Sequence, residues 1–126
     1  MGKSVLIVDD SRASRMMIRH TLSYLPDIQS IREADGGESA LTLYQDSPSD
    51  LVLLDLTMEG MNGFMTLEKL KEIDPEVKVL VISANIQAKA RERVFALGAL
   101  DFISKPFNRE QLKSLVHNAL NYESEL

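Results

Sequence analysis

Several residue types are absent or scarce in this chain of 126 residues, and each absence excludes a class of function. There is no cysteine, which excludes disulfide bonds, zinc sites built from thiolates and catalytic cysteine nucleophiles. Only two histidines are present, without an HExxH motif or paired spacing, so a histidine-rich metal site is not expected. No apolar run approaches the roughly 18 residues that a membrane-spanning helix requires. An apolar core must therefore hold the fold.

Charge and the N-terminal residues narrow the expected partners and location. The formal net charge is −5, which makes the chain a poor binder of phosphate backbones, so no direct nucleic-acid binding is expected. The N-terminal stretch MGKSVLIVDD enters a strand pattern at once and lacks the layout of a cleavable signal. We therefore expect a cytoplasmic protein with no membrane contact.

Short apolar runs alternate with helical patterns along the whole chain. The runs predict five strands, at residues 5–8, 28–34, 51–54, 77–82 and 100–103. The helical patterns predict five helices, at residues 14–25, 37–45, 64–73, 87–97 and 109–122. Continuous apolar strands separated by helices form parallel sheets covered on both faces. The predicted fold is therefore α/β, a doubly wound (βα)5 parallel sheet in a single domain, residues 1–126, with its core at about 4–120 and a frayed end at 123–126.

Candidate site residues follow four of the five predicted strands, whereas the second strand is followed by Asp35-Gly36-Gly37. In chain order the candidate polar residues are Asp9, Asp10, Asp55, Thr57, Ser83 and Lys105, and Pro106 follows Lys105. In an open parallel sheet, ligands bind outside the carboxyl ends of the strands. We therefore expect three carboxylates, a hydroxyl and an ammonium to meet there.

This combination predicts phosphoryl chemistry. Three crowded carboxylates raise one another's pKa, and a hard dication relieves the repulsion. Mg²⁺ prefers oxygen ligands and keeps several waters, and together with Lys105 it would attract a phosphoryl group. Asp55 can then act as the nucleophile and become an aspartyl phosphate. Each residue alone also has an ordinary interpretation as a turn residue, a helix cap or a solvated lysine, and their joint occurrence favours the functional one.

The motifs resemble the receiver domain of response regulators in two-component signalling, with a likeness to single-domain chemotaxis regulators. The matching segments are VLIVDDS, LVLLDLTMEGMNG, VLVISA and DFISKPF, and the resemblance covers residues 4–120. It implies a flavodoxin-like fold with strand order 2-1-3-4-5. It also implies phosphorylation by a histidine kinase or a histidine phosphotransfer protein, as in a phosphorelay. A downstream protein target would bind the face of the fourth helix, fifth strand and fifth helix, and the chain would be a monomer or a phosphorylation-linked dimer.

The resemblance implies a role for each residue of the acidic group. Asp55 would be the phosphoacceptor and a Mg²⁺ ligand. Asp10 would bind Mg²⁺ directly, and Asp9 would do so through water or would assist Asp10. Thr57 would supply its backbone carbonyl as a further ligand.

The resemblance also implies a switch. Lys105 would pair with a phosphoryl oxygen, and Ser83 would donate its hydroxyl to the phosphoryl group. Phe102 would be the switch aromatic, rotating as Ser83 moves. Pro106 would follow a cis peptide bond.

Two positions depart from the family pattern, and two others would affect the lifetime of the phosphoryl group. Glu59 stands where many members have proline, and Phe102 stands where tyrosine is common, so a readout through a phenol is excluded. Thr57 and Asn85 would flank the path of the hydrolytic water and tune the lifetime of the phosphoryl group.

Three arginines lie at helical spacing near the predicted site. Arg12, Arg15 and Arg19 fall on one face of the first predicted helix. They form either a solvated basic face or a docking stripe for an acidic patch on a kinase or phosphotransfer helix.

Other functions remain as alternatives. A Mg²⁺-dependent phosphohydrolase with an aspartyl phosphate often carries a second aspartate two residues after its nucleophile, where this chain has Thr57. Flavin binding is not favoured, because the chain has no tryptophan and no Ser/Thr/Gly-rich phosphate loop after its first strand. The chain is either a complete single-domain regulator or the receiver fragment of a longer regulator with a missing output domain.

Overall fold

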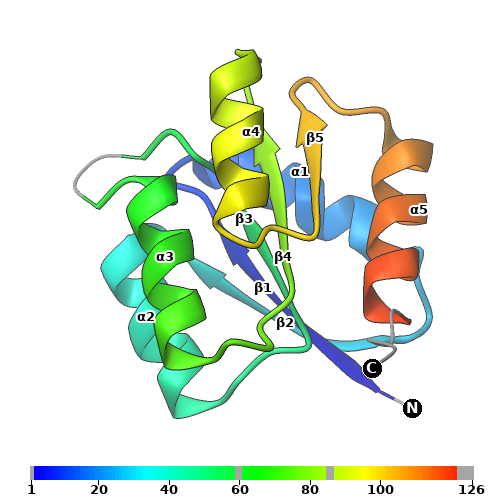
Figure 1. Cartoon of the computed structure of the whole chain (residues 1–126). Coiled ribbons are helices and arrows are strands. Elements are labelled where there is room, and N and C mark those ends of the chain that lie inside the picture. The colour runs from blue at the N-terminus through cyan, green and yellow to red at the C-terminus, as the bar shows by residue number, and fades with distance from the viewer. Residues whose placement is uncertain (1, 59–60, 85–86, 122–126) are drawn as a thin grey trace.

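The computed structural model describes residues 2–58, 61–84 and 87–121. Strands and helices alternate along these residues. In chain order they are β1 (Lys3–Val8), α1 (Arg12–Leu22), β2 (Ile28–Ala34), α2 (Gly37–Asp46), β3 (Leu51–Leu54), α3 (Gly63–Ile73), β4 (Val79–Ser83), α4 (Ala88–Ala96), β5 (Asp101–Ser104) and α5 (Arg109–Leu120). The predicted (βα)5 order is confirmed (Figure 1).

The strands form one parallel sheet in the order β2-β1-β3-β4-β5, which confirms the predicted flavodoxin-like topology. The register of the central strands decides what meets at their carboxyl ends. Val8 of β1 pairs with Leu54 of β3, so Asp9 and Asp55 are the next residues on neighbouring strands. The N–H of Asp55 donates to the carbonyl of Val8 at 3.0 Å and joins the two ends.

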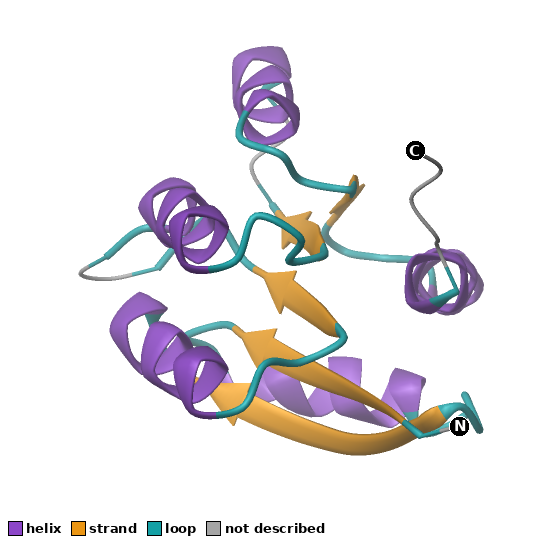
Figure 2. Ribbon diagram, turned by 60° about the horizontal axis from the view of Figure 1, so that its bottom comes forward, coloured by secondary structure: helices purple, strands orange, loops and turns teal. Residues whose placement is uncertain are grey.

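Apolar side chains cover both faces of the sheet. Leu6 and Val8 of β1 pack into a core with α2, α3 and α4. Val5 and Ile7 point to the opposite face and pack with α1 and α5. Figures 1 and 2 show these two helical layers on either side of the strands. This double burial explains why the central strands read as continuous apolar runs rather than as alternating ones.

The first helix is displaced from its predicted range. It covers Arg12–Leu22 rather than 14–25, because the Ser11 side chain accepts a hydrogen bond from the N–H of Ser14 at 3.2 Å and caps the helix early. Other predicted boundaries agree with the observed ones to within two residues. The predicted helix end at 122 and the predicted frayed end at 123–126 lie outside the described residues.

Gly98 follows α4 with a φ of 100°, a left-handed conformation that favours glycine after a helix. None of the helices that the structure describes is long and apolar enough to cross a membrane. The cytoplasmic location stays a prediction.

Candidate functional site

Three carboxylates gather at the carboxyl ends of β1 and β3. One oxygen from each of Asp9, Asp10 and Asp55 lies within 4.8 Å of the others. We call these three residues the acidic cluster. Asp9 and Asp55 are buried, with 2% and 6% of their surface exposed, whereas Asp10 is exposed. The cluster is therefore anchored in the core on one side and open to solvent on the other.

Lys105 reaches the acidic cluster from the end of β5. Its Nζ lies 2.7 Å from Asp9 Oδ2 and 3.6 Å from Asp55 Oδ2. The N–H of Lys105 donates to the carbonyl of Ser83 at 2.9 Å, and the peptide bond to Pro106 is cis. The ammonium thus offsets part of the negative charge of the two buried carboxylates.

Asp55 has the most perturbed carboxyl of the cluster. Burial raises its pKa above the usual value, and the charges of Asp9 and Asp10 raise it further. The Lys105 ammonium and the N–H of Thr57, which lies 3.3 Å from Asp55 Oδ1, act in the opposite direction without reversing the shift. Asp55 is therefore a carboxylate whose negative charge lacks full compensation, and a cation or a covalent change there would relieve it.

The acidic cluster fits a magnesium ion. Its donors are hard carboxylate oxygens, which Mg²⁺ prefers, and their separation suits oxygens that share one ion. Exposed Asp10 leaves the cluster open to the waters that Mg²⁺ retains. Lys105 already shows that the cluster attracts a cation.

Gly63 lets the start of α3 lie against the loop that carries Asp55. A Cβ at this position would collide with the Leu56 Cα, and the Asp55 carbonyl oxygen would be 2.5 Å from it. The N–H of Gly63 donates to the carbonyl of Leu56 at 3.0 Å, and the Asn62 side chain caps the helix by accepting from the N–H of Met65. The backbone contact therefore holds the loop after Asp55 in place.

Ser83 and Thr57, two of the other predicted phosphoryl-handling residues, lie at the same ends of the strands. Ser83 is fully buried as the last residue of β4. Thr57 is exposed two residues after Asp55. Asn85 and Glu59 lie outside the described residues.

Phe102 is buried on β5. Only 5% of its surface is exposed, and the Arg91 guanidinium of α4 lies 5.6 Å from the centre of its ring. A cation over an aromatic face is an attractive contact. The contact with Arg91 was not anticipated from the sequence, since no periodic pattern relates α4 to β5.

The three arginines of α1 have different surroundings. Arg15 and Arg19 both pair with Glu33 of β2, at 2.9 and 2.7 Å, whereas Arg12 is exposed. Arg15 also donates from Nη1 to the backbone carbonyl of Asp9 at 2.6 Å. The helical spacing predicted their common face but not Glu33, because the partner lies on another element.

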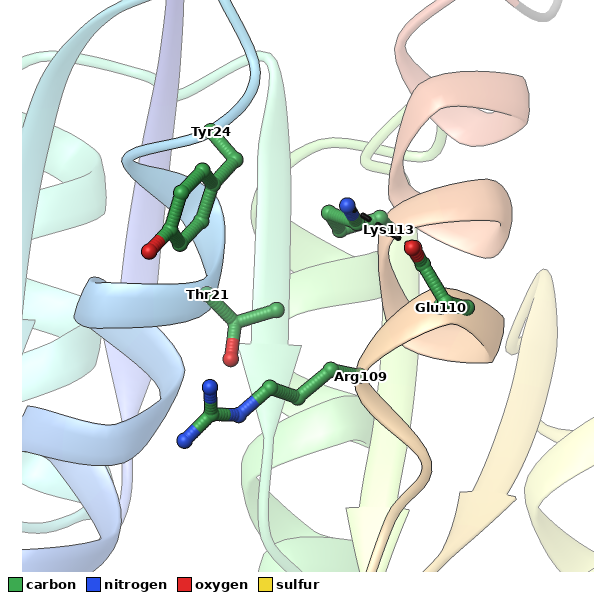
Figure 3. A pocket seen from close by; sticks show the side chains of 5 residues that line it. All are labelled: Thr21, Tyr24, Arg109, Glu110 and Lys113. Carbon is green, nitrogen blue, oxygen red and sulfur yellow. Dashed lines mark ion pairs between the residues drawn. The ribbon is translucent and has the colours of Figure 1, made fainter.

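A separate hollow of about 270 Å³ lies between α1 and α5. Thr21 and Tyr24 line one side, and Arg109 extends from α5 toward α1 (Figure 3). Lys113 pairs there with Glu110 at 2.8 Å. None of the residues predicted to bind metal or phosphoryl lines this hollow, so the acidic cluster remains the candidate site.

Comparison with known proteins identifies the class to which this fold and site belong. Residues 5–117 match the response regulator receiver domain. The chain is 34% identical over 121 residues to the chemotaxis protein CheY of Bacillus subtilis, covering 96% of this chain and 100% of that protein. It is 38% identical over 121 residues to CheY of Thermotoga maritima, covering 96% and 97%.

A solved structure agrees with the sequence relatives. A chain of the CheX-CheY-BeF3-Mg complex from Borrelia burgdorferi superposes with a TM-score of 0.88 at 29% identity, covering 96% of this chain and 90% of that one. The chain therefore belongs to the response regulator receiver family. It is a CheY-like receiver domain of two-component signal transduction, a class of signalling domains rather than catalysts.

Proposed function

We propose that the chain is a phosphorylation-activated receiver that accepts a phosphoryl group on Asp55 from a histidine kinase or a histidine phosphotransfer protein. The observation that carries this proposal is the pairing of a buried carboxylate of raised pKa with Lys105 inside the acidic cluster. A phosphoryl group at this place has an ammonium beside it and open solvent in front of it. Family membership and the similarity to CheY support the same role.

The proposed transfer is an in-line displacement at phosphorus. A carboxylate oxygen of Asp55 forms the new P–O bond while the P–N bond to the donor imidazole breaks, and the electron pair of that bond stays with the imidazole nitrogen. Asp9, Asp10, Asp55 and the Thr57 carbonyl would hold Mg²⁺, and the bound ion would neutralise charge on the phosphoryl oxygens. Lys105 would pair with one of those oxygens.

Phosphorylation is proposed to shift a conformational equilibrium. The phosphoryl group offers oxygens to the Ser83 hydroxyl, and Phe102 moves as Ser83 moves. Phe102 is buried in the present structure, under Arg91 of α4. The surface formed by α4, β5 and α5 would therefore change, and a downstream protein would bind the changed form. The same surface would form the contact between two chains if phosphorylation leads to a dimer.

The docking of the phosphoryl donor and the lifetime of the phosphoryl group also belong to this proposal. Arg12, Arg15 and Arg19 lie on the helix beside the acidic cluster, where a kinase or phosphotransfer helix would approach, although Arg15 and Arg19 already pair with Glu33. Thr57 and Asn85 would tune a weak self-dephosphorylation. That residues 1–126 form a single receiver domain stays a prediction.

The proposal is tested by intact mass after incubation with acetyl phosphate and Mg²⁺. The wild type should gain the mass of one phosphoryl group, and Asp55→Asn should gain none. Asp35→Asn is the matched control, because Asp35 is an exposed aspartate that follows β2 outside the acidic cluster. It should be labelled like the wild type. Continuous release of phosphate from phosphate monoesters over many turnovers would instead indicate a phosphohydrolase and overturn the proposal.

A further inference from the structure

Asp9 is held at each of its polar atoms. Its N–H donates to the carbonyl of Ala34 at 3.1 Å, and Oδ1 accepts from the N–H of Ser11 at 2.9 Å. Oδ2 pairs with Lys105, and the backbone carbonyl accepts from Arg15 Nη1 at 2.6 Å. That carbonyl belongs to the peptide group that leads into the next residue. The contact with Arg15 therefore fixes the plane of the Asp9–Asp10 peptide.

Asp10 has no comparable support of its own. Its side chain is exposed and makes no hydrogen bond or ion pair within residues 2–58, 61–84 and 87–121. Its direction relative to Asp9 and Asp55 therefore depends on the backbone that carries it. The Asp9–Asp10 peptide, held by Arg15, is the nearest fixed part of that backbone.

Arg15 is itself held in place by Glu33. The carboxylate of Glu33 binds Arg15 Nε through Oε1 and Arg19 Nε through Oε2. Burial acts to raise the pKa of Glu33, but the two guanidinium groups outweigh it and lower the pKa below its usual value. The Arg15 side chain is 15% exposed and that of Arg19 is 46% exposed. Glu33 thus stays ionised and directs the more buried guanidinium toward Asp9.

We propose that Arg15, oriented by Glu33, is a positioning residue for Asp10 and thereby sets the affinity of the acidic cluster for a divalent cation. Arg15 touches none of the reacting atoms. Groups that orient a metal ligand typically change metal affinity by about 10- to 100-fold when they are removed. The role rests on the proposed function, in which Asp10 is a Mg²⁺ ligand.

The charge of Arg15 and its contact with the Asp9 carbonyl have opposite expected effects on the Mg²⁺ affinity of Arg15→Ala. Loss of a cation near the acidic cluster strengthens Mg²⁺ binding by simple electrostatics. Loss of the contact with the Asp9 carbonyl frees the peptide and weakens binding. Arg19→Ala removes the same charge and also breaks a pair with Glu33, but Arg19 makes no contact with Asp9 and bonds instead to the Ile31 carbonyl at 3.2 Å. It is the matched control.

The test is calorimetric titration of the full chain with Mg²⁺, together with the Mg²⁺ concentration that gives half-maximal phosphorylation by acetyl phosphate. Arg15→Ala should raise the dissociation constant of Mg²⁺ and the half-maximal Mg²⁺ concentration by about tenfold. In Arg19→Ala, the dissociation constant and the half-maximal Mg²⁺ concentration should be equal to or below those of the wild type. Arg15→Lys keeps the charge but lacks the fork that spans Asp9 and Glu33, so it should also weaken Mg²⁺ binding.

Equal Mg²⁺ affinities for Arg15→Ala, Arg15→Lys and Arg19→Ala would overturn the positioning role while leaving the proposed function standing. A wild type that binds no Mg²⁺ and accepts no phosphoryl group would overturn the proposed function and this role with it. Thermal unfolding of each variant verifies that the titrated chain is folded.

Discussion

Replacing Asp55 by asparagine should make the protein more stable at neutral pH. At an effective dielectric constant of about 20, a neighbouring carboxylate whose oxygen lies within 4.8 Å costs an ionised Asp55 at least about 3.5 kcal/mol before solvent screening. The ammonium of Lys105 at 3.6 Å contributes about 4.6 kcal/mol of attraction. Because Asp10 is exposed, solvent screens part of its repulsion. A net gain of about 1–2 kcal/mol in the free energy of unfolding is therefore expected for Asp55→Asn.

The pH dependence of this gain follows from the raised pKa of Asp55. A group whose pKa is higher in the folded state stabilises the fold when protonated and loses that contribution as pH rises through the folded-state pKa. At neutral pH the wild type thus bears the cost of the ionised carboxyl and the amide variant does not. The difference should shrink as pH is lowered from 7 toward the usual pKa of an aspartate, about 4.

Urea denaturation of the wild type, Asp55→Asn and Asp35→Asn measures the effect. Asp35→Asn removes one negative charge outside the acidic cluster and should change stability by less than about 0.5 kcal/mol. Added Mg²⁺ should stabilise the wild type more than Asp55→Asn, because a ligand raises stability according to its affinity for the folded state. An Asp55→Asn variant no more stable than the wild type at pH 7 would refute the reasoning.

Three further predictions concern the switch, the lifetime and the pH dependence of metal binding. Arg91→Ala removes a contact with Phe102 that is worth about 0.5–1 kcal/mol, so NMR of the unphosphorylated protein should show greater mobility of the Phe102 ring. Arg93 lies over the Phe64 ring instead, so Arg93→Ala should leave the mobility of the Phe102 ring unchanged. Thr57→Ala should change the rate of dephosphorylation, followed by loss of the phosphoryl mass, while the urea midpoint stays within error. Affinity for Mg²⁺, measured by calorimetry, should fall as pH is lowered through the raised pKa of Asp55, because protons compete with the ion. An affinity that does not change as pH is lowered from 7 toward the usual pKa of an aspartate, about 4, would count against Asp55 as a ligand.

Local patterns in the sequence predicted the fold because the apolar pattern of each segment matches its burial in the structure. Continuous apolar runs marked strands buried on both faces, and the strand order was predicted through the family resemblance. The meeting of Asp9 with Asp55 follows from the register of Val8 with Leu54. The sequence does not reveal this register. The proximity of Asp9 and Asp55 could still be predicted, because ligands bind outside the carboxyl ends of the strands in an open parallel sheet.

Contacts between elements that are distant in sequence were beyond the same reasoning. The contact of Arg15 with the Asp9 carbonyl depends on how α1 crosses β1, and its ion pair depends on the position of Glu33 on β2. Helical spacing identifies a face of a helix but not the residue that faces it. The early start of α1 had a local signal, since Ser11 is a favoured capping residue immediately before the observed first helical residue.

The phosphoryl group should be carried by Asp55 and by no other residue. Borohydride reduction of the protein after treatment with acetyl phosphate and Mg²⁺ converts an aspartyl phosphate to homoserine, and peptide mass spectrometry locates the residue. We expect homoserine at position 55 only, and none when Mg²⁺ is chelated beforehand. Reduction at Asp9 or Asp10 instead, or labelling at a histidine or serine that borohydride leaves unchanged, would contradict it.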